Sequence, residues 1–215
     1  MPDTALPDTL LLDLDGTLVD SAPGILGSLR AAFDEVGVPW PEGRIDRTIL
    51  GPPMYVSLPP IIGDAAPAVV AAYRRIYADG GLLQSTPFEG VDELLRDLAA
   101  AGVRMAVATS KAEPFAREIV ERRGWADLFA TVCGDTLAGE RPTKADVVGE
   151  ALRRLGGPGA AVMVGDRSHD VRGARANGLD CLGVAWGYAA PGELDEAGAV
   201  AVYGSPAELA DALGC

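Results

Sequence analysis

The sequence predicts an α/β protein in which a parallel sheet carries helices on both faces and is interrupted by a helical insert. Three observations support this fold class. From residue 87 onward, short apolar strands alternate with amphipathic helices, a pattern typical of βαβ units. One apolar strand, residues 9–14, precedes this series. Between them, residues 40–88 are rich in proline and contain no strand-like run.

The first strand and the insert differ in their apolar period. Residues 9–14 form a short, continuously apolar run, typical of a strand that is buried on both faces. From Ser21 to Val36 the apolar residues recur with the period of a helix, and Gly37 ends it. Eight prolines follow between residues 39 and 87. Short helices are expected near residues 43–49, 54–62 and 67–79.

The remaining elements alternate strictly. Four predicted helices are each followed by a glycine that can end them, at positions 102, 124, 156 and 178. The predicted helices are 91–101, 113–123, 144–155, 169–177 and 206–213. The predicted strands between them are 103–108, 130–133, 161–164 and 181–185.

We therefore expect a doubly wound parallel-sheet (Rossmann-like) core with a small α-helical cap domain inserted after the first strand. The core would comprise residues 1–20 and 87–215, and the cap domain residues 21–86. Two linkers, near residues 19–22 and 84–88, would join them and act as a hinge.

Composition excludes several classes of protein. Of 215 residues, 18 are basic and 31 acidic, so the net charge of −13 argues against nucleic-acid binding, which requires a basic face. Three widely spaced cysteines and a single histidine argue against a disulfide framework, a zinc site or a two-histidine mechanism. The first ten residues lack the basic segment of a signal peptide, and no apolar run approaches about 18 residues. A cytoplasmic location without a membrane partner is expected.

Polar residues gather where the predicted strands end. Ligands of open parallel sheets bind outside the carboxyl ends of the strands. The residues at or near those ends are Asp13, Asp15, Thr109, Ser110, Lys111, Lys144, Asp166 and Asp170. We expect the four carboxylates to converge, although the bend at Gly16 leaves open whether the side chains of Asp13 and Asp15 diverge.

Convergent carboxylates repel one another unless a cation joins them, and their oxygen ligands suit Mg²⁺. Lysines and hydroxyls opposite them suit a phosphoryl group. One carboxylate can act as a nucleophile and form an aspartyl-phosphate, while another acts as acid and then base. The sequence therefore predicts a phosphoryl-transfer site built without a glycine-rich nucleotide loop.

Four segments resemble, in order, the motifs of the haloacid dehalogenase-like hydrolases. Asp13-Leu14-Asp15-Gly16-Thr17-Leu18 is similar to the first motif, D-x-D-G-T-L. Thr109 resembles the second motif, a threonine or serine that ends a strand, and Lys144 resembles the third. Gly165-Asp166-Arg167-Ser168-His169-Asp170 is similar to the fourth, G-D-x-x-x-D. The resemblance covers almost the whole chain.

The resemblance implies roles for these residues. Asp13 would be the nucleophile, and Asp15 the general acid and base. Thr109 and Lys144 would hold the phosphate, with Ser110 as a further candidate. Mg²⁺ would be held by the Asp13 carboxylate, the Asp15 main-chain carbonyl and Asp166, with Asp170 nearby. The second aspartate of the first motif favours a phosphatase, since the dehalogenases of the family lack it.

Further segments narrow the resemblance. Residues 20–25, 51–53 and 183–188 look like those of phosphoglycolate phosphatases and bacterial 5′-nucleotidase-like relatives. The sequence thus predicts a Mg²⁺-dependent phosphatase that acts on a small phosphorylated metabolite, as a monomer or homodimer. A phosphomutase of the same family and a phospho-acceptor signalling module remain alternatives. Substrate choice would lie in the cap domain, where Arg47 is the first candidate for contact with a second anionic group.

Overall fold

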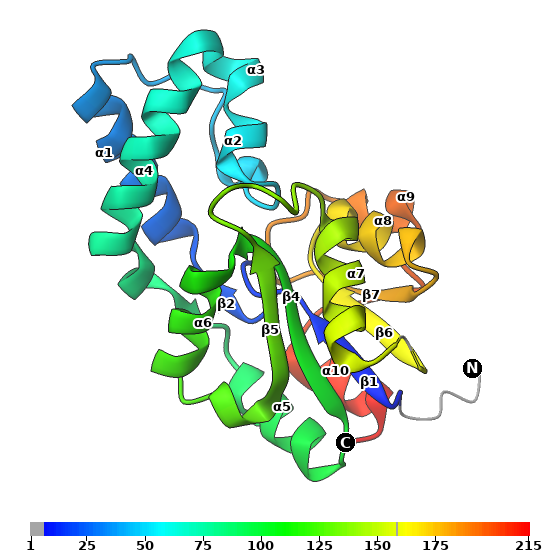
Figure 1. The fold of residues 1–215 in the computed structure, drawn as a ribbon. Helices are drawn as coiled ribbons and strands as arrows, with labels where there is room; N and C mark the ends of the chain where they lie inside the picture. The colour runs from blue at the N-terminus through cyan, green and yellow to red at the C-terminus, as the bar shows by residue number, and fades with distance from the viewer. Residues whose placement is uncertain (1–6, 158) are drawn as a thin grey trace.

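The core is a six-stranded parallel sheet with the order β5-β4-β1-β6-β7-β8 (Figure 1). The computed structural model describes residues 7–157 and 159–215. The strands are β1 (Thr9–Leu12), β4 (Arg104–Ala112), β5 (Phe129–Asp135), β6 (Ala161–Gly165), β7 (Asp180–Val184) and β8 (Ala201–Tyr203). The chain builds outward from β1 first to one side and then to the other, so the predicted doubly wound fold is confirmed.

Helices cover both faces of this sheet. One face packs against α5 (Val91–Ala100), α6 (Glu113–Arg122) and α10 (Pro206–Leu213), and the other against α7 (Lys144–Leu155), α8 (Ser168–Ala176) and α9 (Glu193–Ala197). The side chains of β1 alternate between the two: Leu10 and Leu12 join the first cluster and Leu11 the second. All three leucines are fully buried, so β1 is the centre of the molecule.

Residues 22–84, which we call the helical segment, stand over the carboxyl edge of the sheet (Figure 1). The segment comprises α1 (Ala22–Val36), η1 (Arg47–Ile49), α2 (Met54–Ser57), α3 (Pro59–Ile62), η2 (Gly63–Ala65), α4 (Ala66–Asp79) and η3 (Gly81–Gln84). The chain enters it through β2 (Val19–Asp20) and leaves it through β3 (Thr86–Pro87). These two strands pair antiparallel, Val19 with Pro87 and Asp20 with Thr86, so both linkers cross side by side.

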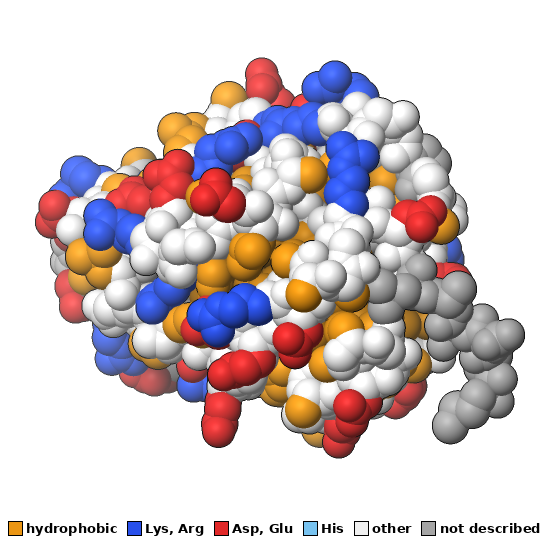
Figure 2. All heavy atoms as spheres, turned by 90° about the horizontal axis from the view of Figure 1, so that it is seen from below, with side chains coloured by type: hydrophobic (Ala, Val, Ile, Leu, Met, Phe, Trp, Pro, Cys, Tyr) orange, Lys and Arg blue, Asp and Glu red, His pale blue; other side chains and the backbone are white. Residues whose placement is uncertain are grey.

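The far end of the molecule has a mixed surface. Seen from the side opposite to the helical segment, acidic and basic side chains are interspersed around exposed apolar ones (Figure 2). Residues 1–6, where no targeting segment is expected, lie outside the described residues.

The sequence analysis did not predict several short elements. The three-residue edge strand β8, the five-residue helix α9 and the two-residue strands β2 and β3 are too short to show an apolar period. The helix expected over residues 54–62 is divided into α2 and α3, because Pro59 starts a new helix. Strand β4 continues to Ala112, four residues beyond the prediction.

The expectation that no segment is long and apolar enough to cross a membrane needs a correction. By length and composition alone, Met54–Asp79 would qualify. The structure divides this stretch into α2, α3, η2 and α4, and Val69, Tyr73 and Tyr77 of α4 are buried in the same apolar cluster as residues of α1.

A close approach between α1 and η3 requires glycine at position 24. A Cβ atom on Gly24 would collide with the carbonyl oxygen of Gly81, whereas one on Gly27, three residues along the same helix, would meet nothing within 4 Å. Gly24 and Gly27 therefore differ in packing. Both destabilise the helix relative to alanine, because glycine loses more conformational entropy on folding.

We expect alanine substitutions at these positions to have opposite effects. Gly24→Ala should lower the free energy of unfolding by about 1–3 kcal/mol through overpacking. Gly27→Ala should raise it by about 0.5–1 kcal/mol through helix propensity. Urea unfolding of both variants measures the difference, and a stabilised Gly24→Ala variant would contradict the packing described for α1.

Candidate active site

Three buried carboxylates meet at the carboxyl edge of the sheet. Asp13 follows β1, Asp166 follows β6, and Asp170 lies in the first turn of α8. One oxygen atom from each lies within 4.8 Å of the others. Their exposed fractions are 5%, 0% and 1%. We call these residues the acidic cluster. Its negative charge is largely removed from water and must be balanced by the protein or by a bound cation.

Lys144 is the buried counter-charge of the acidic cluster. Its Nζ lies 2.7 Å from Asp13 Oδ1 and 2.6 Å from Asp170 Oδ1. The residue is the first of α7, which begins at a capping box between Thr143 and Asp146. Burial opposes the charge of Lys144, but the two carboxylates outweigh it and raise the pKa of the amine above its ordinary value. Lys144 is therefore an ammonium ion at neutral pH.

One ammonium does not balance three carboxylates. Burial raises the pKa of Asp13 to about 6, with Lys144 lowering it and Asp170 raising it. Burial, with Asp170 and Asp13 adding to it, raises the pKa of Asp166 well above its usual range. A set of buried oxygen donors that is short of positive charge fits a divalent cation with a preference for oxygen ligands.

A hydroxyl and a main-chain N–H hold the carboxylate of Asp166 in place. Thr17 Oγ1 donates to Asp166 Oδ1 at 3.2 Å, and the main-chain N–H of Tyr188 donates to Oδ2 at 2.8 Å. Gly16, with φ 86°, passes so close that a Cβ atom there would collide with the same carboxylate. The glycine of the first motif is thus required by both its backbone conformation and its proximity to the fourth motif.

The side chain of Asp15 turns away from the acidic cluster. Its Oδ1 accepts a hydrogen bond from Ser21 Oγ at 2.5 Å, and its Oδ2 lies 3.1 Å from Lys111 Nζ. The expectation that four carboxylates converge is therefore wrong: three converge, and the fourth faces the neighbouring cleft. The bend at Gly16, where the chain turns back so that Gly16 N donates to Val19 O, separates the two aspartates of the first motif.

Lys111 is a residue that the sequence analysis placed at a strand end but gave no specific role. Besides pairing with Asp15, its Nζ donates to Tyr77 OH at 2.8 Å and lies 4.5 Å from the centre of that ring. Burial opposes its charge, but Asp15 and Tyr77 outweigh this and raise its pKa. Because Tyr77 belongs to α4, Lys111 joins the core to the helical segment. Its position directly after Thr109 and Ser110, at a strand end, was the available signal.

The two hydroxyl residues predicted to bind phosphate lie at the end of β4. Thr109 is 1% exposed, and its Oγ1 accepts a hydrogen bond from the main-chain N–H of Lys111 at 3.2 Å. Ser110 is half-buried and lines the cleft that also contains Asp15.

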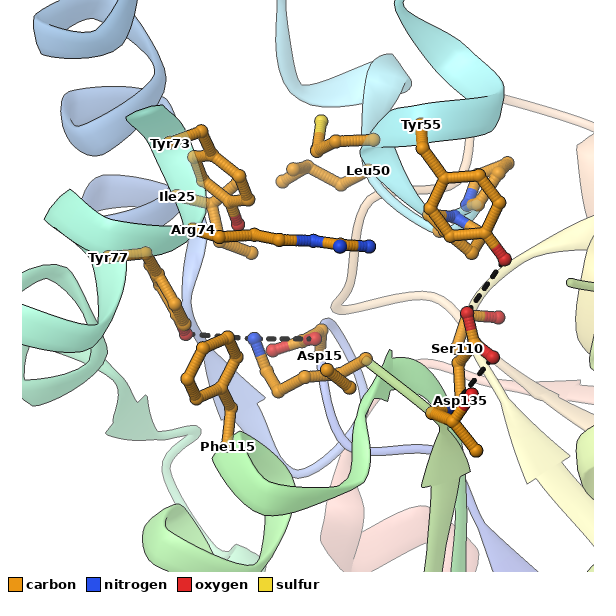
Figure 3. Close-up of a pocket in the computed structure, with 17 residues that line it drawn as sticks. Asp15, Ile25, Leu50, Tyr55, Tyr73, Arg74, Tyr77, Ser110, Phe115 and Asp135 are labelled. Carbon is orange, nitrogen blue, oxygen red and sulfur yellow. Dashed lines mark hydrogen bonds and ion pairs between the residues drawn. The ribbon is translucent and has the colours of Figure 1, made fainter. Parts of the chain in front are cut away.

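A cleft lies between the core and the helical segment (Figure 3). Asp15, Ser110 and Lys111 contribute from the core, and Tyr55 and Arg74 from the helical segment. Other residues that line it are Ile25, Leu50, Met54, Tyr73, Tyr77 and Phe115.

Arg47, the arginine selected from the sequence, is exposed in η1 and does not line this cleft. Its contact with a second anionic group of the substrate stays a prediction. Arg74 of α4 lines the cleft instead.

Arg167 connects the fourth motif to the helical segment. Its guanidinium donates to the carbonyl oxygens of Leu50 and Thr48, the latter at 3.2 Å, and its Nε donates to Glu193 Oε1 at 3.0 Å. Its main-chain N–H donates to Asp170 Oδ2 at 3.0 Å. One buried residue thus contacts both the acidic cluster and the loop that precedes α2. The sequence offered no signal beyond an arginine between two motif aspartates.

The acidic cluster and Lys144 lie at the carboxyl edge of a doubly wound sheet. This is the edge at which α/β proteins of this class bind their ligands, where the strand order reverses. Residues 10–184 match the model of the haloacid dehalogenase-like hydrolases, and the chain belongs to this family. The family predicted from the four motifs is therefore confirmed.

Individual relatives carry different names. The chain is 44% identical over 212 residues to the tyrosine-protein kinase PtkA of Mycobacterium tuberculosis, covering 97% of this chain and 73% of that protein. It is 36% identical to a 5′-nucleotidase of Pseudomonas aeruginosa, with 90% of both chains covered. It is 32% identical to a phosphoglycolate phosphatase of Caulobacter vibrioides, covering 84% of this chain and 80% of that protein. The last two names match the predicted branch of the family.

Solved structures agree with the fold. The crystal structure of a predicted phosphatase from Clostridium acetobutylicum has a TM-score of 0.90 and 32% sequence identity, covering 97% of this chain and 99% of that chain.

The buried contacts of Arg167 generate a stability prediction. Arg167→Met should lower the free energy of unfolding by about 3 kcal/mol, because it breaks a largely buried ion pair and leaves two carbonyls without their donor. Glu193 keeps its bonds from the main-chain N–H groups of Ser168 and Ala190. The loss in the double variant Arg167→Met/Glu193→Gln should therefore be smaller than the sum of the single losses.

Urea unfolding of this double-mutant cycle tests the coupling. Arg172→Met, which replaces an exposed arginine of the same helix, is the control and should change stability by no more than about 0.5 kcal/mol. Strictly additive losses would show that Arg167 and Glu193 do not interact.

Proposed function

We propose that this protein is a Mg²⁺-dependent phosphatase that hydrolyses small phosphate monoesters through an aspartyl-phosphate on Asp13. The observation that carries the proposal is the buried network of Asp13, Lys144, Asp166 and Asp170 at the carboxyl edge of the sheet. In a chain of the hydrolase family, this network supplies a nucleophile, a phosphate-binding cation and a set of metal ligands in one place.

Asp13 is held in a position suited to nucleophilic attack. Its Oδ1 accepts hydrogen bonds from the main-chain N–H of Leu14 at 2.8 Å and from Lys144. The other oxygen, Oδ2, would attack phosphorus, forming a bond to it while the ester P–O bond breaks. The departing oxygen takes a proton from Asp15 and leaves as the alcohol.

Asp15 then acts as the base of the second step. It removes a proton from the water that attacks the aspartyl-phosphate, and the O–P bond to Asp13 breaks to release inorganic phosphate. Lys111 Nζ lies 3.1 Å from Asp15 Oδ2 and holds this carboxylate facing the cleft.

The phosphoryl oxygens would be bound by Thr109, Ser110 and Lys144, which offer two hydroxyls and an ammonium near the nucleophile. Asp13, Asp166 and Asp170, with the main-chain carbonyl of Asp15, would hold Mg²⁺. When bound, this ion neutralises the charge of the phosphoryl oxygens and of the acidic cluster.

Residues 21–86, which include the helical segment, would act as a cap domain, with the core formed by residues 1–20 and 87–215. Further contacts besides those of Lys111 and Arg167 join them, among them a hydrogen bond from Tyr55 OH to Asp135 Oδ2 at 2.7 Å and one from Arg74 Nη1 to Leu137 O at 2.9 Å. Opening about the β2–β3 pair would admit the substrate, and closure would exclude competing water.

A second candidate function is phosphoryl transfer from Asp13 to a hydroxyl other than water. The 44% identity to a protein named tyrosine-protein kinase favours it. Both activities share the covalent step and differ in the acceptor. Measuring released phosphate and transferred phosphate in the same reaction, with tyrosine-containing peptides as acceptors, distinguishes them: a phosphatase releases inorganic phosphate at the same rate with and without the peptide.

Replacing the nucleophile tests the covalent step. Asp13→Asn keeps the size of the side chain but removes the attacking charge, so hydrolysis of p-nitrophenyl phosphate should fall by several orders of magnitude. Asp180→Asn, an exposed aspartate at the start of β7, is the matched control and should leave the rate unchanged. An Asp13→Asn variant that keeps more than about a tenth of the wild-type rate, a barrier change of only ~1.4 kcal/mol, contradicts the assignment.

Metal binding should stabilise the protein in a pH-dependent manner. Because the pKa of Asp13 rises from 3.8 to about 6 on folding, the folded protein holds this proton more tightly than the unfolded chain. The metal-free protein therefore loses stability as pH rises through this interval. Mg²⁺ must displace the proton at lower pH, so it should raise the melting temperature more at about pH 7.5 than at about pH 5.

Differential scanning calorimetry with Mg²⁺ or with EDTA measures this shift. Asp166→Asn, which removes one proposed ligand, should reduce it sharply. Full phosphatase activity in excess EDTA would refute the metal dependence.

A further inference from the structure

Residues 186–188, which follow β7, lie against the loop of the first motif. Trp186 Nε1 donates to the carbonyl oxygen of Thr17 at 3.0 Å. Gly187 comes so close that a Cβ atom there would collide with the carbonyl oxygen of Gly16. This segment belongs to one of the stretches that stand out in the sequence, and the mechanism above uses none of its side chains.

The side chain of Tyr188 reaches from this segment to the start of α1. Its hydroxyl accepts hydrogen bonds from the main-chain N–H groups of Ser21 at 2.9 Å and Ala22 at 3.1 Å. It donates to Asp20 Oδ1 at 2.9 Å. Tyr188 is 5% exposed, and burial raises the pKa of its phenol above the ordinary value, so the phenol keeps its proton. Because this proton points to Asp20, the oxygen lone pairs face the two N–H groups.

Tyr188 takes the place of the side-chain cap that α1 lacks. A serine directly before a helix ordinarily accepts a hydrogen bond from the first turn with its own hydroxyl. Ser21 occupies this position and makes no such bond, since its hydroxyl donates to Asp15 Oδ1 instead. The phenol of Tyr188 supplies an acceptor at this helix end, which leaves the Ser21 hydroxyl free to hold Asp15.

The turn at residues 20–22 depends on this phenol. Within the part of the chain that the structure describes, Tyr188 OH is the acceptor for the N–H of Ser21, whereas the N–H of Ala22 also donates to Asp20 Oδ1 at 3.1 Å. A buried donor without a partner is costly, so the turn would move to find another acceptor if the phenol were absent. Ser21, and with it the carboxylate of Asp15, would move too.

We propose that Tyr188 is a positioning residue for the acid–base step: its hydroxyl fixes the turn at residues 20–22 so that Ser21 holds Asp15 toward the leaving group. The inference rests on the proposed phosphatase function. Tyr188 does not line the cleft, so it acts through Ser21 and not on the substrate. Its main-chain N–H, which donates to Asp166, does not depend on the hydroxyl, so mutation can separate the two contacts.

Two esters of similar size test this proposal. p-Nitrophenolate leaves without a proton, whereas the alkoxide of benzyl phosphate needs the proton of Asp15. Because kcat/KM reports the formation of the aspartyl-phosphate, it isolates this proton transfer. Tyr188→Phe should lower kcat/KM for benzyl phosphate by about 10- to 100-fold and that for p-nitrophenyl phosphate by less than about threefold. The ratio of the two values does not depend on the fraction of folded protein in the sample.

Two further variants provide the controls. Tyr203→Phe removes a phenol from the edge strand β8 and should leave the ratio at its wild-type value. Ser21→Ala removes the contact with Asp15 directly and should lower the ratio as Tyr188→Phe does. Since both substitutions act on the same carboxylate, the double variant should lose little more than the larger single loss.

Three results would overturn the proposal. Equal losses on both esters in Tyr188→Phe, or no loss on either, would show that the hydroxyl does not serve proton transfer. Losses that multiply in the double variant would show that Tyr188 and Ser21 act separately. A smaller rise of the melting temperature with Mg²⁺ in Tyr188→Phe would show that the hydroxyl acts on the metal site through Asp166.

Failure of the proposed function would look different, since the wild-type protein would then hydrolyse neither ester. Amide hydrogen exchange tests the contact without turnover. In Tyr188→Phe the N–H groups of Ser21 and Ala22 should exchange at least about tenfold faster than in the wild type, and in Tyr203→Phe they should not. Unchanged exchange of the Ser21 amide in Tyr188→Phe refutes the role of Tyr188, whether or not the protein hydrolyses esters.

Discussion

The ion pairs of Lys144 with Asp13 and Asp170 are the interaction on which the site depends. Each unpaired buried charge would cost several kcal/mol, so the three residues must be brought together accurately or not buried at all. The sheet order does this, because β1 and β6 are neighbours and the N-terminus of α7 lies at the same edge. The positions of the carboxylates are thus a direct result of strand order.

A second set of contacts joins this rigid edge to the helical segment. Lys111 spans Asp15 and Tyr77, and Arg167 spans the Asp170 turn and the carbonyls of Thr48 and Leu50. Both are buried cations with partners on each side of the cleft. The orientation of the proposed acid–base residue is therefore coupled to the position of the segment above it, and chemistry and substrate enclosure share the same side chains.

The sequence predicts the fold and the acidic cluster because both follow from local signals. Helices 144–155 and 206–213 have the predicted bounds, since each combines an apolar face with an N-cap residue and a C-terminal glycine. The cluster follows from strand ends that parallel pairing brings together. The direction of the Asp15 side chain does not follow, because it depends on contacts with Ser21 and Lys111. Nor does the sequence show that Arg74 lines the cleft and Arg47 does not, because only the packing of α4 decides which arginine faces it.

The pairing of β2 with β3 places the entry and exit of the helical segment side by side. An insertion whose two ends are adjacent constrains the host sheet very little, whatever its length or internal structure. In evolutionary terms, such a junction allows one insert to replace another without moving the catalytic edge of the sheet. Diversification of a family built in this way then requires exchange of a single segment, while the chemistry beneath it is inherited unchanged.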